Sequence, residues 1–195
     1  MIWKNIRVSV VVLCALTILT GVLYPLLVTV VAQMVFPRQA NGSLIQKNGR
    51  VLGSELVGQP FSDPKYFWSR PSATTPFPYN AALSTGSNLG PLNPALLDAV
   101  QQRVKDLKNA DSLNIRPVPV DLITSSGSGL DPHISVASAL YQLERVARVR
   151  GLDVEEVRAL IGQCTEGRTI GLLGEPRVNV LELNLALDER EKEGR

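Results

Sequence analysis

A short segment near the middle of the chain carries the residue types of a nucleophilic site. Residues 124–135 read TSSGSGLDPHIS and hold four serines, Asp131 and His133, the only histidine in the chain. A serine that is activated by a histidine, itself oriented by an aspartate, is the arrangement used by many hydrolases. One hypothesis is therefore an envelope-anchored serine hydrolase in which Ser126 or Ser128 is the nucleophile and His133 is the base.

Several features of the sequence argue against this chemistry. The serines do not fit a G-x-S-x-G elbow, and Asp131 and His133 are so close that one stretch of backbone would have to aim both side chains. A Ser-Gly turn is also an ordinary strand-to-helix connection. The glycine-rich segment Gly86–Gly90 lacks the lysine of a phosphate-binding loop. One histidine and two separated cysteines form no zinc-like cluster. The sequence therefore predicts a chain that is not an enzyme by itself, with no catalytic residue and no metal site.

The elements around this segment predict a mixed domain. Residues 118–124 read as a short strand before it, and residues 135–150 read as a helix after it, stopped by Gly151. Caps and apolar periodicity predict three more helices, and two further patterns predict β-structure. The helices start after Asn93, Asp153 and Asn179; the β-structure comprises a hairpin around Asn48-Gly49 and a strand over residues 169–173.

Residues 58–94 differ from the rest of the chain because they combine seven prolines with six of the ten Phe, Trp and Tyr residues. Proline at this density prevents long helices and interior strands. Two interpretations remain open: these aromatic side chains pack over the core of their own domain, or some of them anchor a partner protein. The candidate subunit interface comprises Tyr66, Phe67, Trp68, Arg70, Tyr79 and Asn80.

The N-terminal part contains an uncharged run, Val8–Pro37. Crossing a bilayer takes roughly 20 apolar residues, so this run predicts a transmembrane helix over residues 8–36. A cleavable signal peptide ending at Ala32 is the alternative, but its apolar region is only about 7–15 residues long. Lys4 and Arg7 precede the run, which predicts a cytoplasmic N-terminus (residues 1–7) and an extracytoplasmic domain (residues 37–195).

Gly21, Tyr24 and Pro25 lie in the middle of this run. Proline removes a backbone hydrogen bond and crowds the carbonyl four residues before it, which belongs to Gly21. Such an irregularity is best tolerated where a neighbouring helix covers the freed carbonyl. We expect either an ordinary kinked anchor or a helix-packing surface formed by these three residues.

Charge and cysteine content limit the choice of partners. Of the 20 Lys and Arg residues only Lys4 and Arg7 precede residue 38, and all 18 Asp and Glu residues follow it, so the large domain has no formal net charge. This balance predicts that no nucleic acid is bound. Cys14 in the span and Cys164 outside it cannot pair within one chain, so the domain is held by its core rather than by a disulfide.

An ordered series of motifs over nearly the whole chain resembles the KdpC family, the C subunits of bacterial Kdp potassium-transporting ATPases. The motifs are Tyr24-Pro25-Leu26, Gln39–Leu44, Gly58-Gln59 with Phe61, Tyr66-Phe67 with Arg70–Ala73, Pro78–Asn80, Gly86–Leu89, Ser128–Asp131, Arg145–Ala147, and Val178–Val180 with Leu183–Leu187.

The resemblance implies a non-catalytic assembly and regulatory subunit of an ATP-driven, high-affinity potassium import pump in the bacterial inner membrane. Its implied partners are a channel-like potassium-binding subunit, a P-type subunit that hydrolyses ATP, and a small single-helix subunit. The resemblance also implies a catalytic chaperone that raises ATP affinity, with Gln142 as the candidate nucleotide contact. An extracytoplasmic domain cannot touch cytoplasmic ATP, so the predicted topology conflicts with direct contact.

These arguments lead to one predicted architecture, a single N-terminal transmembrane helix plus one mixed α/β (α+β) extracytoplasmic domain. The predicted function is that of an accessory pump subunit in the lipid bilayer. No cofactor is predicted from the residues; ATP is implied only by the resemblance, and potassium is transported by the complex. The alternatives are the anchored serine hydrolase and a free-standing binding module.

Overall fold

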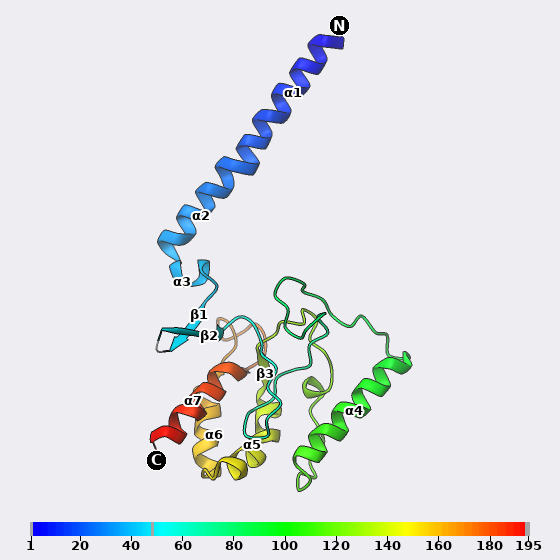
Figure 1. The fold of residues 1–195 in the computed structure, drawn as a ribbon, viewed down its shortest axis with the longest axis vertical. Coiled ribbons are helices and arrows are strands. Elements are labelled where there is room, and N and C mark those ends of the chain that lie inside the picture. The colour runs from blue at the N-terminus through cyan, green and yellow to red at the C-terminus, as the bar shows by residue number, and fades with distance from the viewer. Residues whose placement is uncertain (1, 48, 194–195) are drawn as a thin grey trace. The chain divides into compact units, whose positions relative to one another are not determined.

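A computed structural model describes residues 2–47 and 49–193, and it divides into two compact units, residues 1–44 and 45–195. The first unit is a long helix followed by a short one (Figure 1). Its elements are α1 (Ile2–Ile18), the π-helical turn η1 (Leu19–Leu23), α2 (Tyr24–Val35) and α3 (Pro37–Ala40). Residues 2–35 form one helix long and apolar enough to cross a membrane, with a mean hydropathy of 2.4.

The irregularity predicted at Pro25 is a π-helical turn directly before it. The backbone N–H of Tyr24 donates to the carbonyl of Leu19, five residues back, instead of four. This widened turn is a known way of accommodating a disrupted hydrogen-bond ladder. Thr29 Oγ1 donates to the Pro25 carbonyl at 2.8 Å. A Cβ on Gly21 would meet no other side chain within 4 Å, so this face of the helix is open. Its role as a packing surface stays a prediction.

The second unit begins with the predicted hairpin, formed by β1 (Leu44–Lys47) and β2 (Arg50–Ser54). Gly49 has a φ of 74°, as a tight turn requires, while Asn48 lies outside the described residues. Between Ser54 and Pro94 the described chain forms only turns and loops, as the proline content predicted. Phe67 from this segment is completely buried in the core.

Three helices and a small antiparallel sheet form the centre of the domain. The strands are β3 (His133–Ser135), β4 (Thr165–Glu166) and β5 (Arg177–Asn179), in the order β3-β5-β4. The helices are α5 (Val136–Arg150), α6 (Val154–Gln163) and α7 (Val180–Glu193), which lie together in Figure 1. Their buried side chains include Val146, Val157, Leu183 and Leu187. The mixed helix-and-sheet domain predicted from the sequence is confirmed.

Local signals correctly placed the starts of four helices. Asn93 Oδ1 accepts from Ala95 N ahead of α4 (Pro94–Ala110), and Ser135, Asp153 and Asn179 cap α5, α6 and α7 in the same way. Figure 1 shows α4 set apart from the other three helices. Leu107 is its one buried residue, so the apolar face of α4 contributes little to the core.

Two of the predicted strands are wrong. Within residues 118–124 the chain forms a 3₁₀ turn, η2 (Val120–Leu122), because Asp121 turns inward and its carboxylate accepts from Ser135 N at 2.8 Å. Residues 169–173 form a tight turn closed by a single bridge between Thr169 and Leu173. Short apolar runs do not distinguish strands from turns, and the paired strands lie on either side of this turn.

Candidate functional site

The loop that precedes β3 is held by its own side chains. Ser126 Oγ accepts a hydrogen bond from Gly129 N at 2.9 Å, and Ser128 Oγ accepts one from Leu130 N at 3.1 Å. Gly129 has a φ of 69°, and a Cβ there would lie 2.6 Å from the carbonyl oxygen of Thr85. The two serines and the glycine therefore serve to shape the loop.

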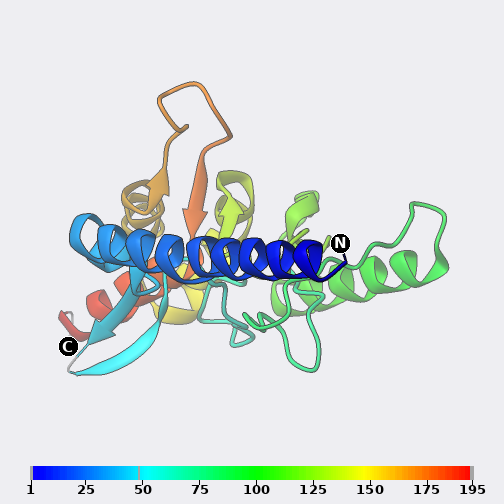
Figure 2. The same ribbon diagram turned by 90° about the horizontal axis from the view of Figure 1, so that it is seen from above.

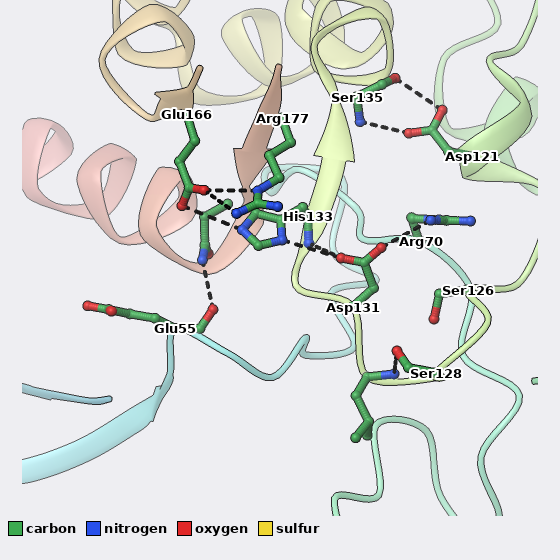
Figure 3. Close-up of polar contacts among 12 residues, drawn as sticks. Glu55, Arg70, Asp121, Ser126, Ser128, Asp131, His133, Ser135, Glu166 and Arg177 are labelled. Atoms are coloured by element: carbon green, nitrogen blue, oxygen red, sulfur yellow. Dashed lines mark hydrogen bonds and ion pairs between the residues drawn. The ribbon is translucent and has the colours of Figure 1, made fainter. Parts of the chain in front are cut away.

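A row of alternating charges crosses the sheet at His133 (Figure 3). Its Nδ1 lies 3.4 Å from Asp131 Oδ1, and its Nε2 lies 3.6 Å from Glu166 Oε1. Each carboxylate also binds an arginine: Arg70 Nη1 lies 3.0 Å from Asp131 Oδ2, and Arg177 Nη2 lies 2.8 Å from Glu166 Oε2. His133 therefore lies between two carboxylates, each of which is also paired with an arginine.

No serine of the loop is brought to His133. Both ring nitrogens face carboxylates, and Ser126 is buried with its Oγ bound to the backbone. Figure 3 shows Ser126 and Ser128 further along the loop, apart from the imidazole. The Asp131–His133 pair thus exists without a nucleophile, and this conformation does not support the serine-hydrolase hypothesis.

The charge row borders an open cleft of about 440 Å³, whose lining includes Arg70, Asp121, Asp131, His133 and Arg177. Most of the charged groups in this lining are paired with one another or with the backbone. In the described part of the chain, no three or more His, Cys, Asp and Glu side chains are grouped so that they could hold a metal ion.

The charge row should make the domain less stable in acid. Burial alone would raise the pKa of Asp131 and Glu166, but hydrogen bonds and charges from His133 and the arginines lower both pKa values below 3.8 and 4.5. A carboxylate with a lowered folded-state pKa stabilises the fold above its unfolded-state pKa and loses that contribution as pH falls. We expect the urea midpoint of the full-length chain in detergent to drop between about pH 5 and pH 3.

The matched comparison for this pH dependence uses the double variant Asp131→Asn, Glu166→Gln, which should show a smaller drop over the same range. Glu156→Gln, at an exposed position of α6, should keep the wild-type slope. If the urea midpoint fell equally steeply with pH in the double variant and in the wild type, Asp131 and Glu166 would not be the cause of the acid sensitivity.

Two buried amide side chains hold the backbone of consecutive residues from the irregular segment. Phe67 N donates to Asn184 Oδ1 at 2.9 Å, and Asn184 Nδ2 donates to the Phe67 carbonyl at 3.0 Å. Trp68 N donates to Gln142 Oε1 at 2.8 Å, and Gln142 Nε2 donates to the Trp68 carbonyl at 3.2 Å. These pairs attach the segment to α7 and α5, and they supply the hydrogen bonds that a neighbouring strand would otherwise give.

Arg145 completes this cluster. Its Nη2 donates to Gln142 Oε1 at 2.7 Å, its Nη1 donates to the Pro64 carbonyl, and its guanidinium lies 4.8 Å from the centre of the Trp68 ring. Burial lowers the pKa of Arg145 to about 10. The sequence analysis named Arg145 only within a family motif and missed this role. Ser138, Gln142 and Arg145 recur at helical spacing on the buried face of α5, which was the available signal.

The structure places Gln142, the nucleotide contact implied by the resemblance, inside the domain. Its side chain is 1% exposed, and both its amide nitrogen and its amide oxygen are bound by protein groups. A nucleotide reaching Gln142 would have to displace the backbone of Trp68 or the guanidinium of Arg145. Direct ATP contact stays a prediction.

The candidate interface residues are distributed between the core and the domain surface. Phe67 and Asn80 are buried, whereas Tyr66, Trp68, Arg70 and Tyr79 are half-buried and bound within the domain. Tyr79 Oη donates to the Arg70 carbonyl, and burial raises the pKa of Tyr79 to about 12. Packing over the domain's own core thus accounts for most of these side chains. Their contact with a partner stays a prediction.

Comparison with known proteins gives a consistent result over nearly the whole chain. The family model KdpC, described as "K+-transporting ATPase, c chain", matches residues 6–189. A potassium-transporting ATPase KdpC subunit of Methylococcus capsulatus is 62% identical over 185 residues, covering 95% of this chain and 97% of the relative. A protein of the same name from Sorangium cellulosum is 62% identical, covering 94% of this chain and 97% of the relative. Another from Polaromonas naphthalenivorans is 63% identical, covering 95% of each chain.

Proposed function

Because the chain belongs to the KdpC family of potassium-transporting ATPase C chains, we propose that it holds the pump's other subunits together and regulates them. As a KdpC subunit it is an accessory subunit of a P-type ATPase complex that transports potassium. The proposal is carried by one observation: the side chains of His133, Ser126 and Gln142, which could otherwise do chemistry, are all bound to other groups within the domain. The partners proposed are the channel-like, ATP-hydrolysing and small single-helix subunits.

The proposed location is the bacterial inner membrane, with the N-terminus cytoplasmic and the large domain extracytoplasmic. Support comes from Lys4 and Arg7, which directly precede the apolar part of the 34-residue helix. Positive residues beside a first span tend to remain on the cytoplasmic side.

Any effect on ATP affinity is proposed to be indirect. A domain outside the membrane cannot reach cytoplasmic ATP, and Gln142 is buried in a cluster that holds the fold. An effect would then travel through the membrane helix as a coupling free energy between two sites. The open face at Gly21 and the π-helical turn before Pro25 would supply the contact with neighbouring helices.

The function is tested by replacing the span. Deleting residues 8–36 should reduce co-purification of the other subunits to background, because both the anchor and the helix contacts are removed. Exchanging the same residues for a leucine–alanine helix of equal length keeps the anchor and should still reduce co-purification about tenfold, as loss of a packed helix interface would. The measurement is the subunit ratio after affinity purification from membranes in mild detergent.

Val11→Leu is the matched control, since it keeps an apolar side chain on α1 and should leave the subunit ratio unchanged. Full recovery of the complex with residues 8–36 deleted would overturn the assembly role. A stable, monodisperse wild-type chain that captures no subunit would favour the free-standing binding module instead.

A further inference from the structure

The turn between β4 and β5 forms a projecting finger, residues 167–176, that is closed by hydrogen bonds between Thr169 and Leu173. Thr169 N donates to the Leu173 carbonyl at 2.8 Å, and Leu173 N donates back at 3.0 Å. Ile170 and Gly171, between them, have φ angles of 57° and 71°, the pair of positive angles found in a type I′ turn. The finger is the orange-brown loop that projects beyond the β4 and β5 arrows in Figure 2.

The tip of the finger is apolar and exposed. Ile170, Leu172 and Leu173 are 90%, 77% and 60% exposed. Ile170 is also β-branched in the left-handed region, where such residues are rare and strained. Among the described residues, the domain leaves nearly all of the Ile170 side chain exposed. A partner that covers the tip would bury this side chain.

The charges of the finger are neutralised at its base. Arg168 Nη2 donates to both carboxylate oxygens of Glu175 at 2.9 Å, and Arg177 pairs with Glu166 at 2.8 Å. The finger contains no lysine, tryptophan or tyrosine. Anionic lipid headgroups attract clusters of basic residues, and membrane interfaces favour Trp and Tyr. This composition therefore favours a protein partner over a lipid surface, and the matching socket on that protein would be apolar and uncharged.

A suitable partner is held within reach. Eight residues, 36–43, separate α2 from β1, so even a fully extended connection spans at most about 28 Å. The proposed membrane helix therefore tethers the domain to the bilayer in which the other subunits of the ATPase are proposed to lie. The finger also lies within residues 6–189, the part of the chain that matches the KdpC family model.

We propose that the finger inserts Ile170, Leu172 and Leu173 into an apolar, uncharged socket on another subunit of the same ATPase. This inference rests on the proposed assembly function and deepens it by naming a contact surface. The turn and the ion pair at its base pre-organise the tip, so little conformational freedom is lost on docking. Small sets of buried apolar residues carry most of the binding energy of such contacts.

The first test measures assembly with the full-length double variant Ile170→Asp, Leu172→Asp. Co-purification with the other subunits should fall at least about tenfold, as expected for charges placed in an interface hot spot. The matched control Leu113→Asp, Ile115→Asp places the same charges at sites that are 73% and 97% exposed elsewhere in the domain, and it should retain the complex. Each purified chain should keep the wild-type urea midpoint, which shows that folding is intact.

The second test places a photo-crosslinking amino acid at position 172 in the assembled complex in native membranes. A cross-link to another subunit supports the proposal, whereas cross-links to lipid alone overturn it. Full retention of the Ile170→Asp, Leu172→Asp variant also overturns it. The variant with residues 8–36 deleted, purified in parallel, separates the proposed assembly function from the proposed finger contact. If the deletion variant no longer co-purifies with the other subunits while the finger variant still does, the assembly function stands and the finger contact fails.

Discussion

Replacing Phe67 by alanine is expected to lower the free energy of unfolding by about 3–5 kcal/mol, the usual cost of removing a buried phenylalanine ring. Phe67 is completely buried, and its backbone N–H and carbonyl are both bound by the Asn184 amide. The ring therefore fills the core at a site where the backbone cannot easily shift to close the cavity. Urea unfolding of the full-length chain in detergent, followed by tryptophan fluorescence, measures the change.

Phe77→Ala is the matched control, because Phe77 belongs to the same proline-rich segment but is 56% exposed. Its substitution should change the free energy of unfolding by no more than about 0.5 kcal/mol. The comparison also decides between the two interpretations of the aromatic segment. If Phe67→Ala left stability unchanged and instead abolished co-purification of the other subunits, Phe67 would be a partner anchor rather than a core residue.

Replacing Gln142 by leucine is expected to destabilise the chain by about 2–4 kcal/mol, because buried polar groups lose their partners. The backbone N–H and carbonyl of Trp68 would each lose a hydrogen bond, and the buried Arg145 guanidinium would lose an acceptor. Leucine has nearly the size of glutamine, so the loss reports the polar contacts rather than a cavity. The readout is again the urea midpoint of the full-length chain.

The same variant separates a structural role of Gln142 from nucleotide contact. Gln101→Leu, on the exposed surface of α4, makes the same chemical change and should leave stability unaltered. In assembled complexes that remain folded, we expect the apparent ATP affinity to follow the loss of stability across a series of variants at positions 68, 142 and 145. A selective loss of ATP affinity in Gln142→Leu, with the urea midpoint unchanged, would favour direct contact.

Helices were predicted well because their signals are local. Asn93, Asp153 and Asn179 each accept hydrogen bonds from N–H groups two or three residues further along the chain. Gly151 adopts a φ of 66° and ends α5 where the sequence predicted. Caps of this kind act within one turn of helix, so residue types and spacing are sufficient to place them.

Strands were predicted poorly because the decisive interactions are distant in sequence. The apolar run 118–124 became a 3₁₀ turn once Asp121 bonded to Ser135, 14 residues further on. The three short strands β3, β4 and β5 contain only two or three residues each, too few for an alternating pattern. Their pairing is set by the packing of α5, α6 and α7 rather than by local preference.

The sequence by itself determined the elements whose hydrogen bonds are made within a few residues, namely the long apolar helix with its irregularity at Pro25 and the capped helices of the domain. Its motifs were also sufficient to indicate the family. Only the tertiary structure decided what the polar residues do. His133 meets two carboxylates instead of a serine, and Gln142 holds the backbone of Trp68, 74 residues away. The physical reason is that a buried polar group must find a partner wherever packing places one, and that partner cannot be identified from neighbours in the sequence.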